Sequence, residues 1–285
     1  MKKIKKAPIL GHIAYSVKGS YGINVLEPKY LAYRFNIFKN VTLKSFQAQT
    51  DQNFNIVLLH SAQLPQEYKD KFSKLEQENI FLHNNYVDDS QRSKDEVAAF
   101  VKYADDIAID FTIDNDDAVP VDFIAKLKPY LQEAYLSHVL SIPKVSTIQR
   151  VKWDVFLKQD NYEIVNSIGL ALVTSRKNYK SIYTAGFHSQ VHTKYPVVLL
   201  LGSGGIRTIN GRNAENELDF LPCLKCSGAQ LRKNLKDSGY AEFDFSCLAV
   251  CPERQWLNFL IKGIKFIWRR IFSRNNRQIF YRTVK

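Results

Sequence analysis

The sequence has no long hydrophobic run. No stretch reaches the roughly 18 apolar residues that a membrane-spanning helix needs, so we expect no spanning segment. Residues 1–6 are lysine-rich, but residues 7–17 are too polar to form the apolar part of a secretory signal. The absence of both features predicts a cytoplasmic protein.

Internal repeats and low-complexity linkers are also lacking. Hydrophobic residues make up 45% of the 285 residues and aromatic residues 13%, which excludes wholesale disorder. We therefore expect one compact α/β unit over residues 1–250 and a basic amphipathic tail over residues 251–285. The glycines at 202–205 lack the GxGxxG spacing of a nucleotide-binding loop, so they predict a turn.

Acidic residues are fewer than basic ones. The chain has 28 Asp and Glu against 40 Lys and Arg, a formal net charge of +12. The acids concentrate within residues 87–122, whereas both ends of the chain are basic. This distribution is typical of a cation-dependent active site on a protein that is attracted to an anionic surface.

Hydrophobic periodicity predicts alternating strands and helices over the first 115 residues or so. The predicted strands are 9–17, 54–60, 80–83 and 107–113, and the predicted helices are 31–49, 65–77 and 94–104. This alternation predicts a parallel sheet with right-handed crossovers. Strands at 145–153, 155–157, 168–174 and 197–201 predict a more antiparallel region after it.

Four polar residues, Asp114 to Asp117, follow the strand predicted at 107–113. Three carboxylates this close repel one another unless a cation or hydrogen-bond donors lie among them. Mg²⁺ and Mn²⁺ prefer such oxygen ligands, and open α/β sheets bind ligands at the carboxyl ends of their strands. The pattern predicts a metal-diphosphate site. The alternative is a solvated acidic turn that caps the next helix.

Three segments carry a resemblance to a known family. They are RFNIF with TLKSFQAQTD within residues 34–51, FTIDNDDAVPVDF at residues 111–123, and RTINGRN at residues 207–213. Together they resemble the bacterial rhamnosyltransferases, which are nucleotide-diphosphosugar transferases with the GT-A fold. The chain departs from the family pattern at Thr112, where arginine is usual, at Asn115, where an acid is usual, and at Ile209, where histidine is usual.

The resemblance implies an α/β fold of the GT-A type, with a mostly parallel central sheet flanked by helices and a C-terminal helical appendage. It also implies a glycosyltransferase that moves a sugar, such as rhamnose, from a nucleoside-diphosphate donor with the help of Mn²⁺ or Mg²⁺. Asp116 would hold the metal, with Asp114 sharing it or contacting the donor. His188 would be a further metal ligand or a pyrophosphate contact, and the alternative is a buried, hydrogen-bonded histidine. In the alternative assignment, Asp117 is the ligand and Asp114 a structural acceptor.

The second half of the site is expected after residue 209. The resemblance places Asn210 and Asn213 near the donor or the acceptor. An inverting transfer needs a general base, for which Glu215, Glu217 and Asp219 are the candidates. We expect Asp116→Ala to abolish transfer without unfolding the protein.

All four cysteines fall late in the chain, at Cys223, Cys226, Cys247 and Cys251. Their paired spacing would suit a structural Zn²⁺, and disulfides are disfavoured in the cytosol. The alternative is a set of buried thiols that pack against leucines.

Residues 256–272 combine an apolar helical stripe with lysine and arginine on its flanks. The stripe consists of Leu257, Leu260, Ile261, Ile264, Ile267, Trp268 and Ile271. This pattern predicts a helix that lies on an anionic membrane surface, and the alternative is a helix packed on the core. No nucleic-acid-binding motif accompanies it, so no nucleic-acid partner is expected.

These features predict a peripheral protein at the inner face of the plasma membrane, acting on a surface-polysaccharide or lipid-linked glycan acceptor. The alternative from another class is a non-catalytic, membrane-associated glycan-binding or assembly protein on the same fold.

Overall fold

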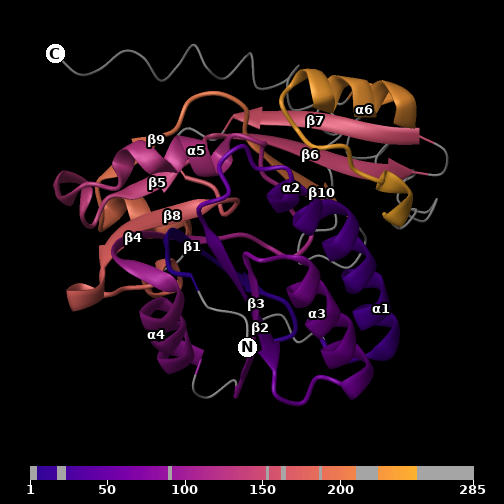
Figure 1. Ribbon diagram of the computed structural model, residues 1–285. Helices are drawn as coiled ribbons and strands as arrows, with labels where there is room; N and C mark the ends of the chain where they lie inside the picture. The colour runs from indigo at the N-terminus through magenta and orange to yellow at the C-terminus, as the bar shows by residue number, and fades with distance from the viewer. Residues whose placement is uncertain are drawn as a thin grey trace, which may run out of the picture.

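The computed structural model describes residues 5–17, 24–88, 92–151, 154–161, 165–185, 188–209 and 224–248. Within them a seven-stranded sheet has the order β3-β2-β1-β4-β8-β5-β9 (Figure 1). Its strands are β1 Ala7–Ala14, β2 Asn55–Ser61, β3 Leu82–Val87, β4 Ala104–Thr112, β5 Val139–Ser141, β8 Leu170–Ser175 and β9 Val197–Leu199. Strands β1 to β4 are parallel, β8 is antiparallel to β4 and β5, and β9 is parallel to β5.

Helices cover both faces of this sheet. They are α1 Pro28–Ile37, α2 Leu43–Gln47, α3 Gln66–Glu78, α4 Arg92–Tyr103 and α5 Phe123–Leu127. Neighbouring β1 side chains point to opposite faces, so Ile9 joins one core cluster with Phe72 of α3, while Leu10 joins another with Phe100 of α4. Figure 1 shows α4 on the opposite side of the strands from α3.

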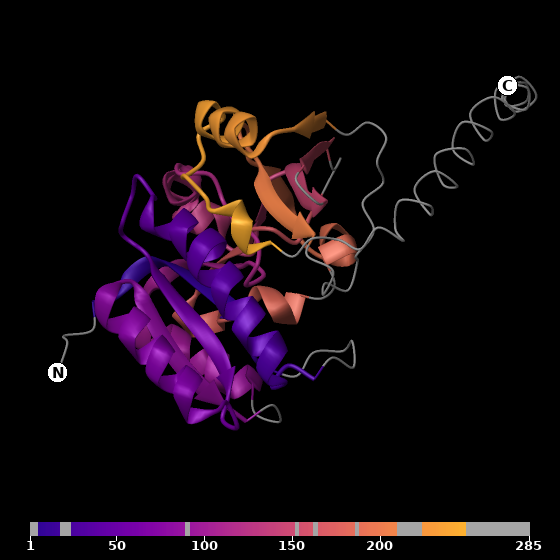
Figure 2. The same ribbon diagram turned by 90° about the vertical axis from the view of Figure 1, so that its right-hand side faces the viewer.

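A smaller sheet has the order β10-β6-β7-β11, with β10 parallel to β6 and the other pairs antiparallel. Its strands are β6 Lys144–Val151, β7 Asp154–Asn161, β10 Gly205–Ile209 and β11 Leu224–Cys226, followed by helix α6 Gly228–Asp237. A shared core cluster joins Ile37 of α1 and Ile148 of β6 to Leu231 of α6. The smaller sheet and α6 therefore pack on the main unit, as Figure 2 shows from the side.

The remaining turns of helix are short. A π-helix, Phe38–Thr42, links α1 to α2. The 3₁₀ turns are Lys128–Tyr130, Glu133–Tyr135, Arg176–Asn178, Ile182–Ala185, His188–Thr193 and Phe245–Cys247.

The predicted α/β class is confirmed, with its mostly parallel central sheet flanked by helices. The boundaries differ in places. The helix predicted at 31–49 starts at Pro28, whose fixed φ suits the first turn, and contains the π-helix. The strand predicted at 197–201 has only three residues. In the described residues no helix is long and apolar enough to cross a membrane.

The predicted turn at residues 202–205 is confirmed. Gly202 has φ of +108°, a conformation that side chains disfavour. A Cβ on Gly204 would lie 1.8 Å from the carbonyl oxygen of Lys144, so glycine is what allows β10 to approach β6. The proposed boundary between residues 250 and 251, and the C-terminal appendage, lie outside the described residues.

Candidate functional site

The acidic turn, residues 114–117, comes directly after β4 at the carboxyl edge of the parallel strands. Its only amide side chain, Asn115, is buried and donates hydrogen bonds of 3.1 Å to the carbonyls of Ala14 and Tyr15 at the end of β1. The backbone N–H of Asp117 donates to the carbonyl of Asp114 and closes the turn. Asn115 therefore acts as a tether between two neighbouring strands, which an aspartate there could not do because it lacks the N–H donors.

Asp116 forms a buried ion pair with Arg34 of α1. Arg34 Nη1 lies 2.5 Å from Asp116 Oδ2, and Nη2 lies 3.1 Å from Oδ1, a bidentate arrangement. Burial by itself lowers the pKa of Arg34, but Asp116, by charge and hydrogen bond, together with Tyr30 and Asp114, outweighs burial, and the net effect is a raised pKa. The guanidinium therefore stays charged and fixes the turn to α1.

Asp117 faces inward, toward β10. Its Oδ1 accepts a 3.3 Å hydrogen bond from the backbone N–H of Thr208, whose hydroxyl donates to the carbonyl of Asp116 at 2.7 Å. Ala118 and Ile206 exchange two backbone hydrogen bonds of 2.7 and 2.9 Å beside it. Burial raises the pKa of Asp117 well above its usual value, and repulsion from the neighbouring aspartates adds to this effect. Asp117 is thus an internal carboxyl group that connects the two sheets.

Asp114 is the exposed carboxylate of the turn. Its charge acts on both Arg34 and Asp117, so it belongs to the same electrostatic cluster. Of the three aspartates, Asp114 is therefore the one that a ligand in solvent can reach. The alternative prediction, a solvated acidic turn, fits the exposed Asp114. It does not fit Asp116 and Asp117, which are buried.

The carboxylates fit a divalent cation only in part. Mn²⁺ and Mg²⁺ take oxygen ligands, and Asp114 offers an accessible carboxylate. Asp116 gives both oxygens to Arg34, so it would bind a cation only if that ion pair opened or shared an oxygen. Within the described residues, no group of three or more His, Cys, Asp or Glu side chains could hold a metal ion. The ligand set of Asp114, Asp116 and His188 therefore stays a prediction.

Several predicted residues fall outside the part of the chain that the structure describes. They are Asn210, Asn213, Glu215, Glu217, Asp219, Cys223, Cys251 and residues 256–272. The same holds for the side chains of His188 and Cys226, although their backbones belong to a 3₁₀ turn and to β11. Asn210 directly follows Ile209, the last residue of β10, and lies two positions after Thr208, which contacts the acidic turn.

Cys247 is the predicted zinc ligand whose side chain is described. Its thiol is buried in the core cluster that includes Leu231, Leu235 and Leu248. Burial raises the pKa of Cys247 to about 12, so the thiol is protonated when no metal is bound. This environment matches the alternative of a packed thiol.

Sequence reasoning missed the part that Arg34 plays. The signal was a charged residue among Leu31, Phe35 and Phe38, whose spacing predicts a buried helix face. A second buried polar cluster lies between β1 and β4, before the acidic turn in the sequence. In it, His12 Nε2 lies 3.0 Å from Asp110 Oδ2, and the Tyr179 hydroxyl donates to the same carboxylate at 2.7 Å.

Among solved structures, the chain is similar to a mannosyltransferase, PcManGT from Pyrobaculum calidifontis, in complex with GDP-Man and Mn²⁺, at 11% identity and a TM-score of 0.42. That match covers 73% of this chain and 59% of the mannosyltransferase, so the chain spans less than two thirds of that protein. It is also similar to the inositol-1-phosphate CTP transferase from T. maritima, at 12% identity and a TM-score of 0.34, covering 82% of this chain and 96% of that one.

No curated protein matches the chain. A family model described as "Putative rhamnosyl transferase" matches residues 23–219, which include Arg34, the acidic turn and β10. The match covers more than half of the 285 residues. The chain therefore belongs to this family of glycosyltransferases, as the sequence motifs predicted.

Proposed function

We propose that the protein transfers a sugar, such as rhamnose, from a nucleoside-diphosphate donor to a surface-polysaccharide or lipid-linked glycan acceptor, with Mn²⁺ or Mg²⁺. The observation that carries this proposal is the exposed carboxylate of Asp114 on a turn whose other three side chains are buried. The turn lies at the carboxyl edge of parallel strands, where α/β sheets bind ligands.

Asp114 is the residue that meets the donor. When bound, a divalent cation supplies positive charge that offsets the charge developing on the departing nucleoside diphosphate. Asp114 would hold that ion, with Asp116 and His188 as its further proposed ligands. If Asp116 stays paired with Arg34, its part is to position the turn.

Arg34, Asn115 and Asp117 are positioning residues in this proposal. Their hydrogen bonds connect the turn to α1, β1 and β10. Each connection limits how far the Asp114 carboxylate can move, so the site needs little reorganisation when the donor binds. Preorganised charges of this kind stabilise charge that develops during a reaction.

The acceptor side is proposed for the segment after β10. Asn210 and Asn213 would contact the donor or the acceptor, and one of Glu215, Glu217 and Asp219 would take the proton of the acceptor hydroxyl. The proposal is supported by chain continuity, since β10 contacts the acidic turn through Thr208 and the segment begins at the next residue but one.

A lipid-linked acceptor agrees with the proposed location at the inner face of the plasma membrane. The basic segment 256–272 would attach the enzyme to anionic lipids there. Zn²⁺ at the four cysteines is a separate proposal, and its alternative is the packing of the Cys247 thiol among leucines.

The second candidate is a non-catalytic, membrane-associated glycan-binding or assembly protein. Two observations favour it: Thr112 replaces the arginine usual in the family, and Asp116 is bound to Arg34. Thr112 directs its hydroxyl to the carbonyl of His12 at 3.3 Å, whereas an arginine there could have held a phosphate.

Isothermal titration calorimetry with a panel of nucleoside diphosphates, with and without Mn²⁺, distinguishes the two functions. The enzyme binds at least one nucleotide, and Mn²⁺ strengthens the binding at least tenfold. Asp114→Ala removes this Mn²⁺ effect. The control is Asp105→Ala, which replaces an exposed aspartate near the other end of β4 and retains the effect. Absence of binding to every nucleotide would favour the non-catalytic protein.

A further inference from the structure

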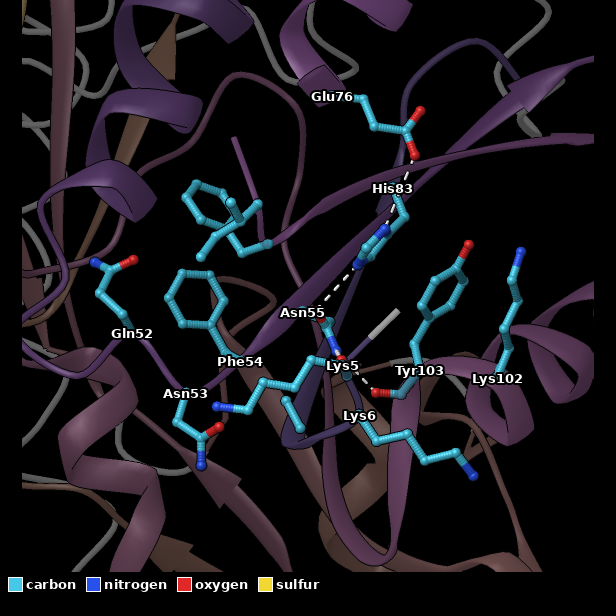
Figure 3. A pocket seen from close by; sticks show the side chains of 13 residues that line it. Lys5, Lys6, Gln52, Asn53, Phe54, Asn55, Glu76, His83, Lys102 and Tyr103 are labelled. Atoms are coloured by element: carbon cyan, nitrogen blue, oxygen red, sulfur yellow. Dashed lines mark hydrogen bonds and ion pairs between the residues drawn. The ribbon is translucent and has the colours of Figure 1, made fainter. Parts of the chain in front are cut away.

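A pocket lies at the edge of the central sheet opposite the acidic turn (Figure 3). It is a pocket of about 520 Å³ lined by residues that precede or begin β1, β2, β3 and β4. Because these four strands are parallel, their amino ends meet at one edge. Strand β4 has nine residues, and a strand rises about 3.3 Å per residue, so roughly 30 Å separates this pocket from the acidic turn.

A buried polar frame shapes the pocket wall. The amide nitrogen of Asn55 donates to the carbonyls of Lys5 and Tyr103 at 2.9 and 2.8 Å, which leaves its Oδ1 facing His83. His83 Nε2 lies 3.0 Å from that oxygen and must therefore be the donor. The His83 ring also stacks on Tyr103, with 4.1 Å between ring centroids (Figure 3). The wall is thus built from satisfied groups that hold a fixed shape.

Three lysines surround this frame, and Figure 3 shows their side chains pointing in different directions. Lys5, Lys6 and Lys102 all line the pocket and are exposed. Glu76 is the one carboxylate among the described lining residues, and it accepts a 2.8 Å hydrogen bond from Asn84 and lies 3.8 Å from His83 Nδ1. The three ammonium groups therefore outnumber the acid and favour an anion.

The pocket also has an apolar side. Phe54 and Phe81 line it, together with Ile80, whose side chain is 72% exposed. An exposed isoleucine next to aromatic rings loses contact with water when an apolar group covers it, which favours binding. The volume is within the range of about 300–1,000 Å³ that is usual for small-molecule sites.

We infer that this pocket binds a small organic phosphate, with an apolar, ring-sized part against Ile80 and Phe81 and a phosphate group toward which the exposed side chains of Lys5, Lys6 and Lys102 would turn. Lysine is a common phosphate ligand because it offers a mobile charge with three donors. The inference does not depend on the proposed transferase activity, because it concerns a site at the other edge of the sheet.

Isothermal titration calorimetry of the full chain with phenyl phosphate in 0.15 M NaCl tests the inference. One saturable site is expected, with affinity at least tenfold higher than for inorganic phosphate or for benzyl alcohol, since each offers only half of the required contacts. The double variant Lys5→Ala/Lys102→Ala should bind phenyl phosphate at least tenfold more weakly. Ile80→Ser should weaken phenyl phosphate severalfold and leave inorganic phosphate unchanged.

Two matched controls locate the binding. Lys74→Ala removes an exposed lysine of α3 that does not line the pocket, and Asp114→Asn alters the acidic turn; both should bind phenyl phosphate like the parent. Thermal melts by circular dichroism confirm that each variant is folded. The inference is overturned by the absence of saturable binding, by unchanged binding in the double variant, or by an equal loss in either control.

Discussion

At the scale of single residues, one ion pair changes how the acidic turn is interpreted. Arg34 and Asp116 are 82 positions apart, and both are buried. The pattern of acids predicted a site at the strand end, and the turn does lie there, but the sequence could not show which carboxylates face inward. That depends on α1 and β10, which reach the turn only in the folded chain. Arg34 among apolar residues was the available signal for a buried charge.

The ion pair also changes the expected effect of Asp116→Ala. Removing this carboxylate leaves a buried guanidinium unpaired, which costs about 3–5 kcal/mol. We therefore expect the variant to lose stability, contrary to the expectation from the sequence that only activity is lost. Urea denaturation at 25 °C measures the difference in free energy of unfolding.

Two variants serve as controls for that experiment. Asp114→Ala removes an exposed carboxylate and should change the free energy of unfolding by less than about 1 kcal/mol. Arg34→Met/Asp116→Leu removes both charges and should recover much of the loss. A cost below about 1 kcal/mol for Asp116→Ala would show that the ion pair does not form in solution.

At the scale of elements, hydrophobic periodicity predicted which residues form strands more reliably than it predicted which strands pair. Apolar patterns, alternating in β4 and continuous in β2, gave β1, β2 and β4 within a few positions, because these strands are buried. The order of the seven strands depends on long-range pairing, such as β4 with β8, that no local pattern encodes. The π-helix after α1 was also missed, because its apolar spacing differs little from that of an α-helix.

Strand β2 carries a pH-sensitive group. His60 is buried against Tyr15, Phe72 and Tyr86, and burial lowers its pKa from 6.5 to about 4 despite the opposing hydrogen bond with Asn84. The unfolded chain binds a proton more readily between pH 6.5 and 4, so His60 contributes to a loss of stability as the pH falls through this window. The shift corresponds to about 3 kcal/mol.

Urea denaturation between pH 7.5 and 4 measures this contribution. His60→Gln lacks the titrating ring, so its free energy of unfolding should fall by about 3 kcal/mol less than that of the parent over the same range. Other acids titrate in both proteins, and the comparison cancels them. Equal falls in the two proteins would show that His60 is not held neutral by the fold.

At the scale of the whole molecule, basic and acidic residues concentrate in different segments of the sequence. Residues 256–285 carry eight lysines and arginines and no acid, out of a net charge of +12 for the chain. In the sequence, the acids concentrate instead within residues 87–122. This distribution is the basis for the proposal that the enzyme works on an anionic membrane and binds its anionic donor through a cation.

Removal of residues 256–285 tests the membrane proposal. Flotation with liposomes that contain an anionic lipid should recover the full chain and lose most of the truncated chain, because the basic apolar segment supplies the binding energy. Liposomes of neutral phosphatidylcholine should recover little of either. Equal recovery of the two chains on anionic liposomes would contradict the interfacial helix.

The central claim is that Asp114 is the carboxylate through which this transferase binds its donor. Nucleotide release from a panel of nucleoside-diphosphate sugars, measured with Mn²⁺ for the parent, Asp114→Ala and Asp105→Ala, tests it most directly. We expect release from at least one sugar nucleotide and near-parental release in Asp105→Ala. Asp114→Ala should lose at least 100-fold in rate, on the order of 3 kcal/mol in the barrier. Full turnover by Asp114→Ala would contradict it.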